Sequence, residues 1–169
     1  MRTLALALVA GLAASAAHAQ GTTATASFID ADGETIGTAT LTETPNGVLI
    51  EVDVEGIEAG EHGFHVHETG ECDPATGFDS AGGHYAAGME HGFLVEGGPH
   101  PGDMANVFVG EDGTLRHEVV NDRVSIEGGD NPLMDDDGSA LMIHSGADDY
   151  TTQPDGAAGG RVACAVIGM

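Results

Sequence analysis

Residues 47–67 read GVLIEVDVEGIEAGEHGFHVH, and their pattern favours two β-strands separated by a turn. In the first part, Val48, Ile50, Val52 and Val54 recur at every second position, with acidic residues between most of them. Successive side chains of a strand point to opposite faces, so this spacing predicts a strand with one buried face. The glycine-containing segment that follows predicts a turn into a second strand.

The second strand is expected over residues 62–67, HGFHVH, and it carries two histidines on one face. His65 and His67 are two positions apart, so their imidazoles lie side by side, while Val66 faces the core. Two imidazoles on a rigid strand provide half of a copper or zinc site. The alternative is a pair of surface histidines on a polar strand face, and the rest of the chain has to distinguish the two.

Short segments of the same kind, bounded by turn signals, recur along the chain. Further strands are expected over 22–29, 34–44, 104–110, 114–120, 123–128, 139–145 and 161–168. No helical period of any length appears, so the fold class is all-β, a sandwich or barrel of about eight strands. Two long loops, 69–103 and 146–160, interrupt the strands, and ordered loops of such length usually carry function.

Residues 1–19 have the features of an export signal. Arg2 provides the charged start, residues 4–12 the apolar stretch, and Ala17-His18-Ala19 a small-residue cleavage site before Gln20. The apolar stretch is too short to span a bilayer, so we expect no stable membrane anchor. The remaining residues, 20–169, are expected to form a single domain in the periplasm or outside the cell.

The chain is strongly acidic, with 28 Asp and Glu residues against 4 Lys and Arg, and a formal charge of −24. It contains no lysine. Nucleic acid is therefore excluded as a partner, because nothing supplies contacts to phosphate. A disordered acidic chain is also disfavoured, because 41% of the residues are hydrophobic and the strand pattern is regular.

The two cysteines, Cys72 and Cys164, lie on the expected exported part of the chain. In an oxidising compartment a single pair most simply forms one disulfide, although two unpaired thiols are the alternative.

Histidines gather in the loops and strands that flank HGFHVH. The long loop contributes His84, His91, His100 and Asp103, and a late strand contributes His144. Together with His65 and His67 these are more ligands than one metal ion needs. Two neighbouring ions that share one imidazole would use them all, with four histidines suiting copper and three histidines with a carboxylate suiting zinc.

Several of these stretches, in this order, resemble the exported bacterial form of Cu,Zn superoxide dismutase. They are GFHVHE at 63–68, SAGGHY at 80–85, HPGD at 100–103, IHSGADDY at 143–150 and GGRVACAVIG at 159–168. The resemblance extends from about Phe28 to Gly168 and implies an antiparallel Greek-key β-barrel. It also implies a dismutase that converts superoxide to dioxygen and hydrogen peroxide and protects the cell against extracytoplasmic oxidative stress.

The resemblance assigns a role to each candidate residue. The implied copper ligands are His65, His67, His84 and His144. The implied zinc ligands are His84, His91, His100 and Asp103, so that His84 bridges one copper and one zinc per subunit. His84 is also implied to take up and release a proton during the redox cycle.

Other residues are implied to support these ligands. Asp148 matches the carboxylate that joins a copper ligand to a zinc ligand, Arg161 matches the arginine that receives the anionic substrate, and Cys72 and Cys164 match the family disulfide. His62 and His117 receive no catalytic role. Members of the family occur as monomers and dimers, so a homodimer is a possible assembly.

One departure from the family pattern concerns zinc. The spacing from His84 to His91 is one residue shorter than usual, and alanine stands at 86 and 87, where a proline is common. Zinc affinity or loop order is therefore expected to differ from the family norm.

Three other functions are compatible with parts of the pattern. A copper or zinc buffer would lack a copper ligand or the arginine, and a copper-only dismutase would lack the zinc ligands. An adhesion module would leave the histidines unexplained. All the expected ligands are present, which favours the dismutase.

Overall fold

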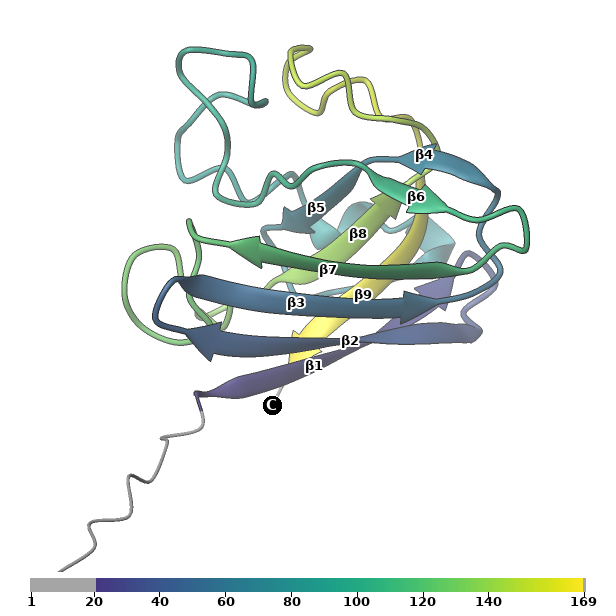
Figure 1. The fold of residues 1–169 in the computed structure, drawn as a ribbon, viewed down its shortest axis with the longest axis horizontal. Helices are drawn as coiled ribbons and strands as arrows, with labels where there is room; N and C mark the ends of the chain where they lie inside the picture. The colour runs from purple at the N-terminus through teal and green to yellow at the C-terminus, as the bar shows by residue number, and fades with distance from the viewer. Residues whose placement is uncertain (1–20, 169) are drawn as a thin grey trace, which may run out of the picture.

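The computed structural model describes residues 21–168, so the expected export signal lies outside the described residues. Nine strands form within this range (Figure 1). They are β1 Thr23–Asp30, β2 Thr35–Thr44, β3 Gly47–Val54, β4 Gly60–His62, β5 Phe64–His67, β6 Val107–Val109, β7 Leu115–Asn121, β8 Ala140–His144 and β9 Arg161–Gly168. Two 3-10 turns, η1 Pro74–Thr76 and η2 Asp79–Ala81, are the helical elements. The predicted all-β class is confirmed.

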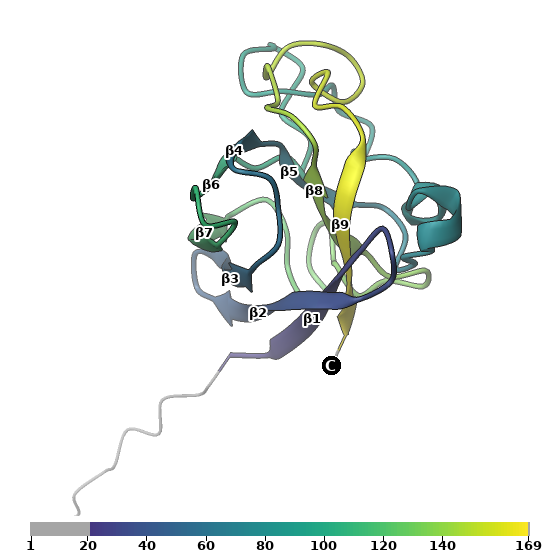
Figure 2. The ribbon, with the colours of Figure 1, turned by 90° about the vertical axis from the view of Figure 1, so that its right-hand side faces the viewer.

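Seven strands form one antiparallel sheet in the order β5-β8-β9-β1-β2-β3-β7, and β4 pairs with β6. Because neighbours in space are often distant in sequence, the connections cross the sheet as in a Greek key. The sheet curls on itself, and β4 and β6 lie between its two edge strands, β5 and β7 (Figure 2). The result is a barrel, and closure protects most strand edges from pairing with another chain.

The barrel interior is filled by the alternating apolar residues that the sequence predicts. On β3, Val48, Ile50, Val52 and Val54 are all buried, whereas Glu51 and Asp53 are exposed. Each strand contributes one inward face in the same way, and the largest buried side chains of this core include Phe28, Leu41, Ile50, Phe64, Leu115, Leu141 and Ile143. Burial of one apolar face per strand is the main force that closes the barrel.

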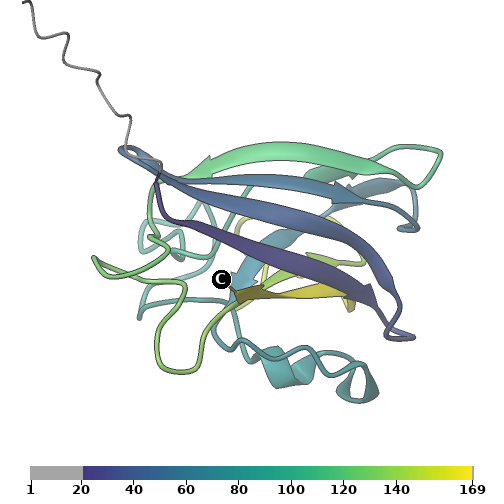
Figure 3. The ribbon, with the colours of Figure 1, turned by 90° about the horizontal axis from the view of Figure 1, so that it is seen from below.

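A second, smaller apolar cluster lies outside the barrel. Phe78 and Ala81 pack against Met142 and Cys164 on the outer side of β8 and β9. Figure 3 shows the two 3-10 turns alongside these strands, on the side away from β2 and β3. The disulfide Cys72–Cys164 fastens the loop to the barrel at this point, with its Cα atoms 5.8 Å apart. The predicted disulfide is therefore present.

Two strand predictions differ from the structure. The expected strand 62–67 is divided at Gly63, because its main-chain N–H donates to Gly146 (2.8 Å) and its carbonyl accepts from His144 (2.9 Å). The expected strand 123–128 is wrong, since this segment has only one isolated bridge, from Ser125 to Pro132. Its apolar side chains are buried in the barrel core all the same.

Two long loops follow β5 and β8, and both extend from the same end of the barrel (Figure 1). They span residues 68–106 and 145–160. Within the described part of the chain, no helix is long and apolar enough to cross a membrane.

Candidate metal centre

Strand β5 places its histidines as the sequence predicts. His65 and His67 are buried on one face, and Val66, also buried, belongs to the barrel core. Isolated bridges connect this strand to the long loop, from His65 to Asp103 and from His67 to His84. The loop therefore pairs with the edge of this strand, and the burial of both histidine side chains removes the alternative of two surface histidines.

Four histidines gather at this position. Each offers a ring nitrogen, and these nitrogens lie within 4.8 Å of one another. The members are His65, His67, His84 and His144, from β5, the long loop and β8. The Nε2 atoms of His67 and His144 are 3.4 Å apart, and all four side chains are buried. We call these four residues the four-histidine group.

A second group shares His84 with the first. Its members are His84, His91, His100 and Asp103, and their ligand atoms also lie within 4.8 Å of one another. Oδ1 of Asp103 lies 3.2, 3.1 and 3.2 Å from the Nδ1 atoms of His84, His91 and His100. Its Oδ2 accepts main-chain N–H bonds from Gly92 (2.9 Å) and His100 (3.0 Å). We call these residues the three-histidine–aspartate group.

Several buried nitrogens of the two groups have no hydrogen-bond partner. They are Nδ1 of His65, Nε2 of His84 and Nδ1 of His100. Buried polar atoms are normally paired, because desolvation without a partner costs about 1–3 kcal/mol each. A cation at each group satisfies these atoms, and three imidazoles facing one carboxylate oxygen match a tetrahedral zinc ligand set. The donor sets therefore fit one copper and one zinc.

Asp148 is buried and contacts one histidine of each group. Its Oδ2 accepts from Nε2 of His65 at 2.8 Å, and its Oδ1 accepts from Nε2 of His91 at 3.0 Å. Tyr150 N–H also donates to Oδ1, and the Asp148 N–H donates to Asn106 Oδ1 at 2.9 Å. Such bonds fix the orientation of both rings through Nε2 and direct the opposite nitrogen, Nδ1, toward the ligand group.

Burial sets the charge state of three members of the four-histidine group. Desolvation is the largest cause that lowers the pKa of His67 to about 2, of His84 to about 4 and of His144 to about 3. These rings are therefore neutral at neutral pH, which is the form that binds metal.

The pKa values of the two buried carboxylates are also lowered, in this case against the effect of burial. Burial alone raises the pKa of Asp103, but the close imidazoles of His100 and His84 and a hydrogen bond from the Gly92 N–H outweigh it and hold this pKa below its usual range. The pKa of Asp148 is lowered in the same way by His65 and His91. Both carboxylates are ionised at neutral pH, so they are ready to balance bound cations.

A cavity of about 500 Å³ opens onto the four-histidine group. His67, His84 and His144 form part of its wall, and Arg161 lies in the same wall. The remaining lining residues are Glu68, Gly83, Ala86, Met89, Glu90, His100, Gln153, Pro154, Asp155 and Gly159. The long loops thus form a channel from solvent to the histidines, and Arg161 is its only cationic side chain.

Arg161 is held in place by main-chain carbonyls. Its guanidinium donates to the carbonyl oxygens of Phe78 and Gly82, the latter at 2.6 Å from Nη2, and the side chain is 19% exposed. The Gly82 carbonyl also lies 3.0 Å from Nδ1 of His67. One loop residue therefore positions both the arginine and a ligand, and the nearby disulfide fastens that loop.

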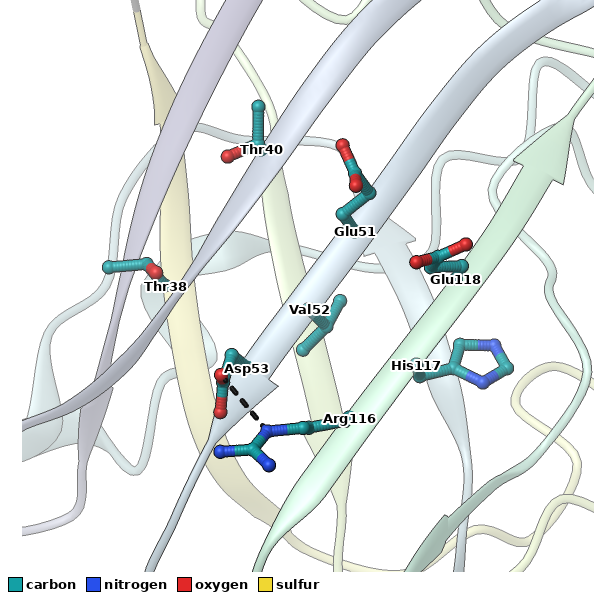
Figure 4. A pocket seen from close by; sticks show the side chains of 8 residues that line it. All are labelled: Thr38, Thr40, Glu51, Val52, Asp53, Arg116, His117 and Glu118. Atoms are coloured by element: carbon teal, nitrogen blue, oxygen red, sulfur yellow. Dashed lines mark hydrogen bonds and ion pairs between the residues drawn. The ribbon is translucent and has the colours of Figure 1, made fainter.

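A second hollow of similar volume lies on the outer face of β2, β3 and β7 (Figure 4). Arg116 and Asp53 form an exposed ion pair there, with 3.2 Å between Nε and Oδ2. Exposed pairs of this kind contribute little, and neither histidine group borders the hollow. The channel at the loop end is the better candidate site.

Three residues with structural roles at the site have no signal in the sequence. His62 is buried, and its Nδ1 lies 2.7 Å from the His144 carbonyl while its Nε2 lies 2.8 Å from the Glu58 carbonyl. Gln153 accepts from the His91 N–H and donates to the His91 carbonyl, each at 2.8 Å. Arg123 donates to the Asp103 carbonyl at 2.6 Å. All three contact main-chain atoms of ligand-group residues, and such contacts depend on loop geometry.

The comparison with known proteins agrees with this geometry. The family pattern described as copper/zinc superoxide dismutase matches residues 35–167. A superoxide dismutase [Cu-Zn] from Aquifex aeolicus is 46% identical over 156 residues, which cover 90% of this chain and 91% of the relative. The superoxide dismutase [Cu-Zn] of Caulobacter vibrioides is 45% identical, over 85% of this chain and 84% of the relative.

Solved structures show the same relationship. A SOD-like protein from Bacillus subtilis superimposes with a TM-score of 0.79 at 33% identity, covering 83% of this chain and 95% of that one. The Cu/Zn superoxide dismutase of Brucella abortus gives a TM-score of 0.69 at 29% identity, over 86% and 99% of the two chains. The matching sequence pattern, the relatives and the paired histidine groups agree, and the chain belongs to the copper/zinc superoxide dismutase family.

Proposed function

We propose that this protein is a copper- and zinc-dependent superoxide dismutase whose active site is the channel at the loop end of the barrel. The reaction converts two superoxide ions and two protons to one dioxygen and one hydrogen peroxide. The observation that carries the proposal is the position of His84. Its Nε2 faces the four-histidine group without a hydrogen-bond partner, and its Nδ1 faces Asp103 at 3.2 Å.

The two groups are assigned to different metals by their donor chemistry. Four imidazoles suit copper in both oxidation states, so the four-histidine group is the proposed copper site. Three imidazoles and a carboxylate suit tetrahedral zinc, so His84, His91, His100 and Asp103 form the proposed zinc site. Copper held by the first group would supply the electron transfer, and zinc held by the second would supply a fixed positive charge beside the shared His84 ring.

The chain's own residues provide binding, orientation and proton transfer. Arg161 places a fixed positive charge in the channel wall beside His67 and His144, where a superoxide anion binds. His84 takes up a proton at Nε2 during the cycle and passes it to the peroxide that leaves, while Asp103 keeps the ring oriented from the Nδ1 side. Asp148 holds the rings of His65 and His91 in place throughout.

Export is part of the proposal. Residues 1–19 are proposed to direct the chain out of the cytoplasm and to be removed, leaving residues 20–169 as one domain. The Cys72–Cys164 disulfide supports this, because such bonds persist in oxidising compartments. The protein would then act in the periplasm or outside the cell, as protection against superoxide there.

The test is metal analysis of the purified protein together with a superoxide-consumption assay. We expect one copper and one zinc per chain and rapid consumption of superoxide. His144→Ala should lose copper and activity while zinc remains. His117→Gln is the matched control, because His117 lies outside both ligand groups, and it should retain metals and activity. A protein loaded with both metals and inactive toward superoxide would contradict the proposal.

A further inference from the structure

Arg123 lies in the connection between β7 and β8. It contacts, at two points, the part of the 68–106 loop that carries His91, His100 and Asp103, which we call the zinc-ligand loop. Its Nη2 donates to the main-chain carbonyl of Asp103 at 2.6 Å. Its guanidinium carbon lies 5.5 Å from the centre of the Phe93 ring, at a distance typical of a cation–π contact. Phe93 is two residues after His91, so one side chain contacts the loop beside two of the proposed zinc ligands.

The contact with Asp103 leaves the carboxylate untouched. Oδ1 of Asp103 faces three imidazoles, and Oδ2 accepts from the main chain of Gly92 and His100. Arg123 binds the carbonyl instead, so it orients the residue without occupying an oxygen that a cation needs. A guanidinium bound to the carboxylate would compete directly with zinc.

Arg123 is itself held firmly. Its N–H donates to Asn121 Oδ1 at 3.0 Å, and its carbonyl accepts from Asn131 Nδ2, also at 3.0 Å. Asn121 is buried and donates from Nδ2 to the carbonyl of Pro101 at 2.8 Å. Asn121, the last residue of β7, and Arg123, two residues later, thus both bind the loop segment that ends in Asp103.

Phe93 extends the contact toward the other loop. Its ring lies 5.5 Å from the ring of Tyr150, and the Tyr150 hydroxyl accepts from the Asn106 N–H at 2.8 Å. Asn106 in turn accepts from the N–H of Asp148. Arg123, Phe93 and Tyr150 therefore form a continuous chain of contacts between the zinc-ligand loop and the loop that carries Asp148.

The small number of basic residues in this chain makes the position of Arg123 notable. The described residues contain three arginines and no lysine, against a large excess of acids. Arg161 lies in the channel, and Arg116 forms an exposed pair on the outer sheet face (Figure 4). Arg123 is the remaining cation, and it is partly buried against the zinc-ligand loop.

From these contacts we propose that Arg123 is a positioning residue for zinc: it holds Asp103 and the loop around His91 in the arrangement that binds the ion. The inference rests on the proposed zinc site and adds a residue to it. Loss of the guanidinium removes the hydrogen bond to the Asp103 carbonyl and the cation–π contact with Phe93. Contacts of this kind around a metal site typically change affinity about 10–100-fold.

The experiment is a titration of the metal-free protein with zinc in competition with a chromophoric chelator, repeated with copper. Arg123→Gln should bind zinc roughly 10-fold or more weakly, with a much smaller change for copper. Arg123→Lys should bind zinc more tightly than Arg123→Gln, because an ammonium still provides one donor and a charge. Arg116→Gln is the matched control, since Arg116 is 77% exposed and remote from both groups, and it should match the unsubstituted protein.

The absorption spectrum of cobalt(II) bound at the zinc site gives a second readout, and Arg123→Gln should alter its intensity. Zinc affinity and a cobalt spectrum equal to those of the unsubstituted protein would overturn the proposal. So would equal losses of zinc and copper affinity with a lowered unfolding temperature, which would indicate general destabilisation. If the unsubstituted protein binds no zinc, the assigned zinc site itself fails, and this result is distinct from the other two.

Discussion

Asp148 accepts a hydrogen bond from Nε2 of His65 at 2.8 Å, and both side chains are buried. The bond assigns the ring proton of His65 to Nε2, so that Nδ1 faces the other histidines of the four-histidine group without a proton. The same carboxylate binds His91 from its other oxygen. One buried anion therefore sets the orientation of one ring in each group.

Replacement of Asp148 by Asn should weaken binding of at least one of the two metals. An amide has one accepting oxygen, so its NH₂ group would face one of the two Nε2 atoms and favour the wrong tautomer of that ring. We expect affinity for zinc, copper or both to fall about 10–100-fold in competition titrations. Asp149→Asn is the matched control, because that carboxylate is exposed and binds only Thr151 and Thr152. Equal effects of the two substitutions would contradict this role.

Substitution of Arg161 should lower activity without emptying the metal sites. The guanidinium is the only cation in the channel wall, so Arg161→Ala removes the charge that attracts and orients superoxide. We expect kcat/KM to fall roughly 10-fold or more by stopped-flow assay, with metal content unchanged. Arg161→Lys should retain part of the activity, and Arg116→Ala should retain all of it. A fully active Arg161→Ala protein would remove the arginine from the mechanism.

Salt should not slow the enzyme. A formal charge of −24 repels superoxide at long range, and Glu68, Glu90 and Asp155 line the channel beside Arg161. Raising ionic strength from about 10 to 150 mM shortens the screening length from roughly 30 to 8 Å, which weakens this repulsion. The rate of superoxide consumption should rise or stay constant over that range. A steep decrease would show that attraction by local charges dominates the approach.

Acid should destabilise the metal-free protein. His67, His84 and His144 ionise near 6.5 when exposed but only near 2, 4 and 3 in the folded chain, chiefly because of burial. Between about 6.5 and 4 the unfolded state therefore binds more protons, and the free energy of unfolding falls as the pH falls. The lowered pKa of Asp103 adds a further loss below about 3.8.

Urea denaturation of chelator-treated protein at a series of pH values measures this effect. His144→Gln should show a shallower loss of stability across the same range, because one buried titrating group is absent. A midpoint that is constant from pH 7 to pH 4 would contradict the assignment of neutral buried rings.

Strands could be predicted from the sequence where a segment both buries one face and forms hydrogen bonds with neighbouring strands, as Val48 to Val54 does. The segment 123–128 shows the limit of that signal. Val124 and Ile126 alternate as in a strand because they fill the barrel core, yet no neighbouring strand pairs with them along their length. Periodicity reports which face is buried, and it does not report where the main-chain hydrogen bonds go.

Some residues of the candidate site could be predicted from the sequence, and others could not. The positions of His65 and His67 follow from a spacing of two, and the remaining proposed ligands follow from motifs that resemble a known family. The roles of His62 and Gln153 could not be predicted, because each contacts main-chain carbonyls or amides that only the folded loops bring into reach. A hydrogen bond to a carbonyl leaves no pattern of residue types.

The membership of His84 in both ligand groups has a consequence for how the metals are taken up. Two ions that share one imidazole have linked binding equilibria. If an ion on one side raises the affinity for the second by some factor, the second raises the affinity for the first by the same factor. Loss of zinc should therefore change the retention of copper by the same factor as loss of copper changes the retention of zinc, and the order in which the ions enter changes the path but not the final stability.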